Sequence, residues 1–132
     1  MSTPALVPGV AVIYPGTGPD SDGGRPHIHV LVSGPTAKND ILLIPICSTH
    51  QKCDRTVVLK PKAGWEDIKW ESYAAYYKAK KVSAKVLTKR IESSEITYLG
   101  EIPKDAYASI IKGIEDSGET EPWFLEEFLK LK

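Results

Sequence analysis

The chain has 132 residues and equal numbers of basic and acidic side chains, so its formal net charge is zero. This length predicts about one domain of about 100–200 residues, large enough to fold around one core without disulfides or metals. The sequence has no apolar run of roughly 18 residues and no basic leader followed by an apolar stretch, so neither a membrane span nor a signal peptide is expected. Two cysteines do not make a disulfide framework, and a cytoplasmic protein is therefore expected.

The neutral total hides a strong asymmetry along the chain. Residues 1–51 carry a net charge of −1, residues 52–90 carry +7 and residues 91–132 carry −6. Such asymmetry is typical of a face that binds a polyanion. The structural alternative is that these charges lie on solvated strand and helix faces that the fold brings together.

Short strands are predicted through the first three quarters of the chain. Runs rich in β-branched and apolar residues indicate strands at 10–14, 27–33, 41–46, 55–60 and 96–100, with a glycine-rich loop at 16–24. Pro45 predicts a strand end or a bulge. The segment 74–82 is compatible with a helix, but its alternating pattern favours a strand, and 86–87 begins a short helical stretch or connection.

Two helices are predicted in the C-terminal third. The first follows Pro103 and ends near Asp116–Gly118, and the second begins near Thr120 or Glu121 with Pro122 in its first turn. Strands followed by helices predict an α+β fold, mainly β: a small antiparallel β-barrel with helices at one end. We expect one barrel domain over residues 1–118 and a C-terminal helical extension, 119–132, packed on the same domain.

One cluster of possible metal ligands precedes the basic segment. Cys47, His50 and Cys53 offer three zinc ligands, with His27 or His29 as a fourth. Zinc sites usually have cysteines separated by about two to four residues, whereas these are separated by five. The alternative reading places Cys47 at the inward end of a buried strand and Cys53 in a loop, and no metal is expected.

A second cluster lies where the glycine-rich loop meets the strand at 27–33. Metal-free RNA cleavage needs a base for the 2′-hydroxyl, an acid for the leaving 5′-oxygen and a cation for the phosphorane. Histidine, with an unperturbed pKa near ~6.5, suits proton transfer, which indicates His27 or His29. The planar guanidinium of Arg25 matches phosphate oxygens. The alternative is one partly buried strand histidine and one surface histidine.

No phosphate-binding loop, HExxH or GxSxG motif is present, so nucleotide-dependent and classical hydrolase chemistry are not supported.

Aromatic residues alternate with lysines in the basic segment. Such aromatics stack on unpaired bases while the cations follow the phosphate backbone, although packing in a core is the more common use. The five residues concerned are Trp65, Trp70, Tyr73, Tyr76 and Tyr77.

Taken in order, these short signals resemble the PemK/MazF growth-inhibitor toxins of bacterial toxin–antitoxin systems. The resemblance runs from about Pro8 to Gly113. It rests on PGVAVI at 8–13, GRP followed by HIHVLVS at 24–33, LIPICSTHQ at 43–51 and GEIP at 100–103. A divergent PemK-like branch is similar also in DRTVVL at 54–59, ESYAAY at 71–76 and IKGIEDS at 111–117, but it has a histidine near position 65, where this chain has Trp65.

The resemblance implies an SH3-like barrel, usually a homodimer, that cleaves single-stranded RNA at specific sequences without a metal. It implies a catalytic role for Arg25 and for the position of a threonine in the turn, which falls here at Cys47, Ser48 or Thr49. It also implies a partner, an antitoxin whose disordered segment folds onto the barrel and blocks the RNA groove.

The expected function is therefore that of a toxin endoribonuclease without a cofactor. The predicted catalytic residues are Arg25, His27, His29, Ser48 and Thr49, and the predicted RNA-binding residues are His50, Lys52, Arg55, Lys78, Lys80 and Lys81. The main alternative is a non-catalytic barrel module of mobile-element or phage origin that binds protein or nucleic acid. That alternative predicts histidines that lie apart, whereas a ribonuclease predicts basic residues gathered around Arg25. The acidic tail is expected to cover the barrel, extend an interface or screen the basic segment.

Overall fold

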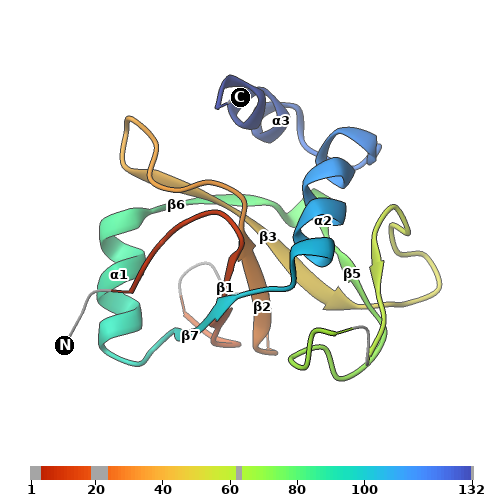
Figure 1. The fold of residues 1–132 in the computed structure, drawn as a ribbon, viewed down its shortest axis with the longest axis horizontal. Coiled ribbons are helices and arrows are strands. Elements are labelled where there is room, and N and C mark those ends of the chain that lie inside the picture. Colours follow the sequence, from red (N-terminus) through yellow and green to blue (C-terminus); the bar gives the residue numbers. More distant parts are fainter. Residues whose placement is uncertain (1–3, 19–23, 62–63, 132) are drawn as a thin grey trace.

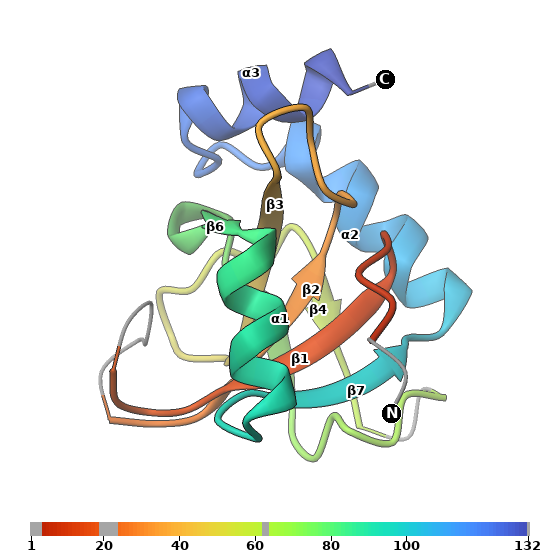
Figure 2. The same ribbon diagram turned by 90° about the vertical axis from the view of Figure 1, so that its left-hand side faces the viewer.

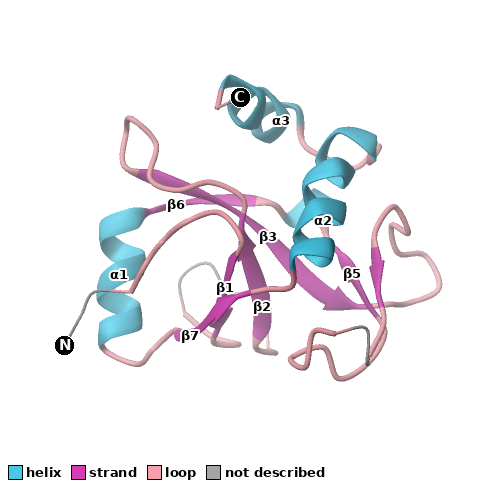
Figure 3. Ribbon diagram, in the orientation of Figure 1, coloured by secondary structure: helices cyan, strands magenta, loops and turns pink. Residues whose placement is uncertain are grey.

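The computed structural model describes residues 4–18, 24–61 and 64–131, so the predicted loop at 16–24 lies partly outside the described residues. Within the described residues, strands predominate before residue 84 and helices after it (Figures 1 and 3). The elements are β1 (Val10–Tyr14), β2 (His27–Leu31), β3 (Asp40–Ser48), β4 (Val58–Leu59), β5 (Ser72–Ala74), the 3-10 helix η1 (Tyr76–Lys78), β6 (Lys80–Ser83), α1 (Ala84–Glu92), β7 (Thr97–Glu101), α2 (Lys104–Asp116) and α3 (Pro122–Lys130). The predicted α+β fold, mainly β and with helices at the C-terminus, is confirmed.

The seven strands form one antiparallel sheet in the order β4-β5-β3-β2-β1-β7, and β6 also pairs with β3. β4 and β7 end this path without pairing with each other, so the described sheet is open and not a closed barrel. β3 is the longest strand and lies at its centre. β2 pairs with one side of β3 through residues 28–31 and 43–46.

Both faces of the sheet are covered, which explains why β3 is apolar almost throughout. The larger core lies on the face covered by α2 and α3, which contribute Ile110, Ile114, Phe124 and Phe128. A smaller core lies on the opposite face, where α1 contributes Leu87 (Figure 2). Alternation along β2 sends Val30 to the larger core and Leu31 to the smaller one.

Three local expectations are corrected by the sheet, and the first concerns Pro45. Pro45 lies within β3, opposite His29, and not at a strand end. β3 pairs with β6 through residues 40–43 and with β5 through 46–48, so Pro45 lies between these two partners. A proline there removes no ladder hydrogen bond, and its carbonyl accepts a hydrogen bond from the Ala75 amide (2.8 Å).

The predicted single strand at 74–82 is broken into β5, η1 and β6. Tyr76 explains the break: its side chain is fully buried, and its hydroxyl donates to the carbonyl of Ile110 in α2 (2.7 Å). Gly113 makes room for this contact, because a Cβ there would overlap the Tyr76 side chain. The predicted strand at 55–60 is reduced to β4, because the Asp54 carboxylate accepts hydrogen bonds from the Thr56 amide and hydroxyl.

The C-terminal segment packs on the same core as the rest of the chain. Phe124 and Phe128 of α3 are buried in the larger core, and burial of such a side chain contributes about 1.5–3 kcal/mol to stability. Glu127 also accepts a hydrogen bond from Lys81 of β6 (2.8 Å). Among the described residues, no helix is long and apolar enough to cross a membrane.

Candidate functional site

A pocket of about 320 Å³ opens where β2, β3 and β5 meet η1 and the loop at 64–71. Five residues predicted for catalysis or RNA binding line it: Arg25, His27, Ser48, His50 and Lys78. The other lining residues are Pro26, Ile28, Ile46, Cys47, Asp67, Ile68, Lys69, Trp70, Ser72, Tyr73 and Tyr77. The fold thus joins the loop-to-strand junction before β2 to the turn after β3.

The permanent charge around this pocket is positive. Arg25, Lys69 and Lys78 line it, against the one carboxylate of Asp67. Cations gathered at a concave surface raise the local concentration of an anionic ligand. The charge of this pocket therefore favours an anionic ligand.

A close contact between two glycines fixes the position of Arg25. The Gly24 amide donates to the Gly16 carbonyl (2.8 Å), and Gly24 has a positive φ of +92°, which favours glycine. A Cβ on Gly16 would lie 2.8 Å from the Arg25 nitrogen. The base of the glycine-rich loop is closed at this contact, and the exposed Arg25 side chain follows directly.

The two histidines of β2 have different surroundings. His27 lines the pocket and is only partly buried. His29 is fully buried, its ring centroid lies 4.5 Å from that of Tyr14, and its Nδ1 donates to the His27 carbonyl (3.0 Å). A direct catalytic role predicted for His29 does not fit this position, because an enclosed ring does not reach a bound phosphate. Its hydrogen bond to the backbone of His27 instead fits a structural role within β2.

Tyr73 connects His50 to the wall of the pocket. The Tyr73 hydroxyl lies 3.4 Å from His50 Nε2, and the two rings meet edge to face at 5.7 Å. Burial, with a hydrogen bond to Tyr77, raises the pKa of Tyr73 far above its usual value. Tyr73 therefore remains protonated at neutral pH, and its oxygen can accept a hydrogen bond from Nε2–H of His50.

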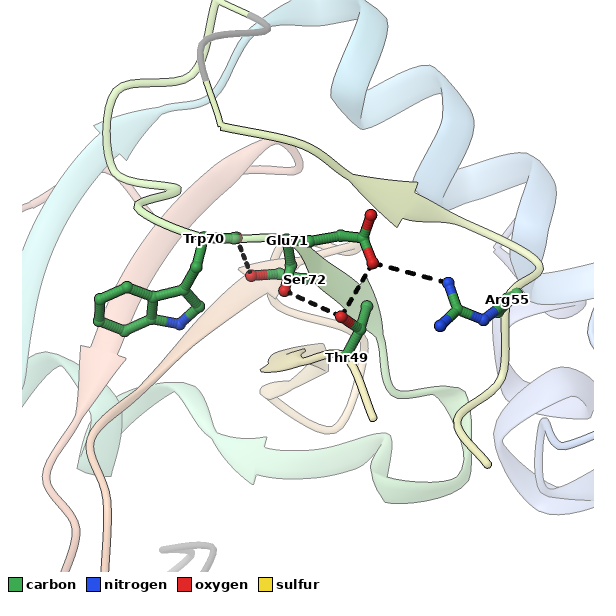
Figure 4. A network of polar contacts seen from close by, with 5 residues as sticks. All are labelled: Thr49, Arg55, Trp70, Glu71 and Ser72. Carbon is green, nitrogen blue, oxygen red and sulfur yellow. Dashed lines mark hydrogen bonds and ion pairs between the residues drawn. The ribbon is translucent and has the colours of Figure 1, made fainter. Parts of the chain in front are cut away.

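Thr49 belongs to a network beside the pocket and does not line it (Figure 4). Its hydroxyl donates to the Glu71 carboxylate (3.0 Å), and its amide donates to the Glu71 carbonyl (3.1 Å). Arg55 lies 3.6 Å from the same carboxylate. The predicted catalytic Thr49 and RNA-binding Arg55 thus hold Glu71, which directly precedes β5.

The other predicted RNA-binding lysines lie away from the pocket. Lys52 is exposed in the turn at 51–53 and does not line it. The Lys80 ammonium lies 5.5 Å from the Tyr14 ring centroid. Lys81 pairs with Glu127 of α3, and this hydrogen bond raises the pKa of Lys81. Of the three predicted lysines at 78–81, the fold therefore brings only Lys78 to the pocket.

The loop at 64–71 supplies Trp70, which the sequence indicated as a possible stacking residue, and also Asp67 and Lys69, which sequence reasoning did not predict. Trp65 and Ile68 anchor it in the larger core, and the Trp65 indole donates to Asp67 (3.2 Å). Anchoring at these positions presents Asp67, Lys69 and Trp70 to the pocket. The spacing of apolar residues in the loop was the available signal, but it does not reveal which site the loop borders.

The described residues offer no group of three or more His, Cys, Asp or Glu side chains that could hold a metal ion. Cys47, His50 and Cys53 all lie within this part of the chain and therefore do not assemble the zinc site considered from the sequence. Both cysteines are free thiols, and Cys47 is buried beside Tyr73 and Ala75.

Comparison of the chain with protein-family models gave no match, and no curated protein matched its sequence.

Proposed function

We propose that this protein is an endoribonuclease of the PemK/MazF toxin kind that cleaves single-stranded RNA. The observation that carries the proposal is the pocket that brings Arg25, His27, Ser48, His50 and Lys78 together from separate segments. An arginine, two imidazoles, a hydroxyl and an amine are a sufficient set for transfer of a phosphodiester to a neighbouring hydroxyl.

In the proposed reaction the ribose 2′-oxygen attacks phosphorus as the bond to the 5′-oxygen breaks. His27 takes the proton from the 2′-hydroxyl, and His50, held by Tyr73, gives a proton to the departing 5′-oxygen. Arg25 stabilises the charge that develops on the phosphorane. The products are a 2′,3′-cyclic phosphate and a 5′-hydroxyl, so the step consumes no water and no cofactor.

The remaining groups bind and position the substrate. The exposed Ser48 hydroxyl donates to a phosphate oxygen, and Lys78 holds the adjoining backbone. Thr49 and Glu71 support the pocket without contacting the substrate. Their hydrogen bonds fix the segment that carries the pocket residues Trp70 and Ser72.

The test is induced expression in bacteria, with growth and RNA integrity read from the same cells. The wild type is expected to arrest growth and fragment RNA, and Arg25→Ala to abolish both. In vitro, loss of such a charge-stabilising group slows cleavage by about 10²–10³-fold. Lys85→Ala is the matched control, because Lys85 is exposed on α1, outside the pocket. Cleavage by Arg25→Ala at the wild-type rate would refute the proposal.

The second candidate is a non-catalytic module that binds protein or nucleic acid. The observation in its favour is the separation of His27 from His29, of which one lines the pocket and the other is buried. This candidate predicts normal growth and intact RNA for the wild type and for Arg25→Ala alike. The first candidate is preferred because His50 supplies a second imidazole at the pocket.

The proposal carries expectations about partners. A toxin of this kind acts in the cytoplasm, forms a homodimer and is held inactive by an antitoxin. An acidic antitoxin segment complements the cations of the pocket and is expected to compete with RNA. Light scattering tests the dimer, and competition by an acidic peptide against a labelled RNA tests the shared groove.

A further inference from the structure

The five aromatic residues of the basic segment fall into two groups in the structure. Trp65, Tyr73 and Tyr76 are buried, with at most 6% of their surface exposed. Trp70 and Tyr77 are 63% and 43% exposed, and both line the pocket that Arg25 borders. The fold has therefore placed two large exposed rings where a positively charged pocket opens.

The backbone at Trp70 is fixed while its indole is left accessible. Ser72 Oγ donates to the Trp70 carbonyl (2.8 Å), and the next residue, Glu71, is held by Thr49 and Arg55. Figure 4 shows the Glu71 carboxylate directed into this network and the Trp70 indole directed away from it. The ring thus projects from a fixed support and requires little ordering on binding.

Tyr77 comes to the pocket from a different element, η1. It follows Tyr76, whose buried hydroxyl fixes the turn to α2, and its own hydroxyl takes part in a hydrogen bond with Tyr73. The Lys78 ammonium lies 5.5 Å from the Tyr77 ring centroid. A cation and an aromatic face therefore lie together, as a phosphate and its base do in a nucleotide.

We infer that Trp70 and Tyr77 form a stacking platform that binds unpaired nucleobases beside the phosphate held by Arg25. The inference rests on the proposed function for the identity of the ligand as single-stranded nucleic acid. The aromatic faces take bases of any kind, while Arg25, Lys69 and Lys78 neutralise the backbone. Charge complementarity favours this occupant, because the pocket has three cations and one carboxylate around its two exposed rings.

The test separates binding from cleavage by the use of a 2′-deoxy oligonucleotide, which lacks the nucleophile of the proposed reaction. A labelled single-stranded DNA 12-mer is titrated at low salt, with fluorescence anisotropy and tryptophan quenching as readouts. Trp70→Ala is expected to weaken binding by roughly 5- to 150-fold and to remove most of the quenching. Tyr77→Ala is expected to weaken binding, and Tyr77→Phe, which keeps the ring, to restore most of the loss.

Trp123→Ala is the matched control, since Trp123 is 40% exposed on α3 and does not line the pocket. Two further readouts distinguish stacking from a structural effect. The dependence of affinity on salt should be unchanged in Trp70→Ala, because no phosphate contact is lost, and reduced in Lys78→Ala. A 12-mer made of abasic sites should bind the wild type and Trp70→Ala equally.

The inference is overturned if Trp70→Ala binds within twofold of the wild type, or if it weakens binding of the abasic strand as strongly. An absence of wild-type binding to the DNA strand overturns it as well and points to a protein partner. The proposed function fails separately: if Arg25→Ala cleaves RNA like the wild type while Trp70→Ala loses binding, the platform stands without the catalytic assignment.

Discussion

Two polar clusters in this molecule contain the same three kinds of side chain. The open cluster consists of Arg25, His27 and Lys78, which line the pocket. The closed cluster consists of Arg90, His29 and Lys80, which gather around the ring of Tyr14 beneath α1 at 5.3, 4.5 and 5.5 Å from its centroid. The histidines of the two clusters are two residues apart on β2, and the lysines are two residues apart across the end of η1.

Access separates the clusters more clearly than residue type does. In the closed cluster His29 is fully buried and Arg90 is 8% exposed, and the Arg90 guanidinium meets Glu95 through two contacts of 3.1 and 3.2 Å. The open cluster faces a pocket of about 320 Å³. We therefore expect changes in the open cluster to affect chemistry and changes in the closed cluster to affect stability.

The largest expected effect concerns the two histidines: one substitution should lower the cleavage rate and the other should lower the stability. His27→Asn should slow RNA cleavage by about 10²–10⁴-fold with an unchanged midpoint of thermal unfolding, because it removes a proton-transfer group at the pocket. His29→Asn should lower the midpoint and leave the cleavage rate of the folded protein near that of the wild type. Its amide retains a donor for the His27 carbonyl. Single-turnover kinetics and calorimetry on both variants measure the two effects.

The opposite result would show that the open and closed clusters do not differ in this way. If His29→Asn slowed cleavage as much as His27→Asn at equal stability, the buried histidine would act in the reaction.

Local sequence signals predicted much of the fold. The β-branched run at 10–14 is β1, and the prolines at 103 and 122 mark the beginnings of α2 and α3. Arg25, Ser48 and His50, which were assigned to one site from the sequence, line one pocket, and their role there stays a prediction. The beginnings of strands and helices depend on residues close in sequence, which is why local patterns reveal them.

Features that depend on distant contacts were not predictable in this way. Alternation places His27 and His29 on the same side of a strand, but α1, more than fifty residues later, covers only one of them. The turn at η1, fixed by a hydrogen bond from Tyr76 to Ile110, sends Lys78 to the pocket and Lys80 to Tyr14. A run of lysines does not reveal such a division, because the contact that decides it lies in α2.

A second prediction concerns the support of the open cluster. Gly16→Ala places a Cβ 2.8 Å from the Arg25 nitrogen, so the chain at Arg25 must move. A displacement of about 1 Å at a reacting group lowers the rate by about 10²-fold. Gly118→Ala is the control, since a Cβ there meets open space. Cleavage assays on both variants test this, and a fully active Gly16→Ala would show that Arg25 does not need this fixed position.

A third prediction concerns the stability of the closed cluster. Arg90→Leu removes a nearly buried guanidinium from Glu95 and Tyr14, and we expect it to lower the free energy of unfolding by about 1–3 kcal/mol. Arg25→Leu, at an exposed position, should change the same quantity by less than about 0.5 kcal/mol. Urea unfolding measures both. Equal losses would mean that the two arginines do not differ in structural role.

The smallest expected effect lies at Asp54, which joins the chain before β4 to the end of α2. Burial opposes its charge, but hydrogen bonds from Ser117 (2.6 Å) and from Thr56 outweigh burial and lower the pKa of Asp54. A carboxyl with a folded pKa below its unfolded value of about 3.9 stabilises the fold above about pH 4, and this contribution is lost as the pH falls through the folded pKa.

Asp54→Asn should therefore have a lower melting temperature than the wild type at neutral pH and a smaller decline below about pH 4. Thermal unfolding between about pH 2 and 7 measures this, with the exposed Glu66→Gln as control. If the melting temperatures of Asp54→Asn and of the wild type decline equally as the pH falls, the lowered pKa of Asp54 does not contribute to stability. Asp54 is outside the pocket, so RNA cleavage at neutral pH should be unchanged in the variant. A polar group whose hydrogen bonds are satisfied within the fold stabilises the protein, whereas catalysis needs polar groups that remain accessible to the substrate.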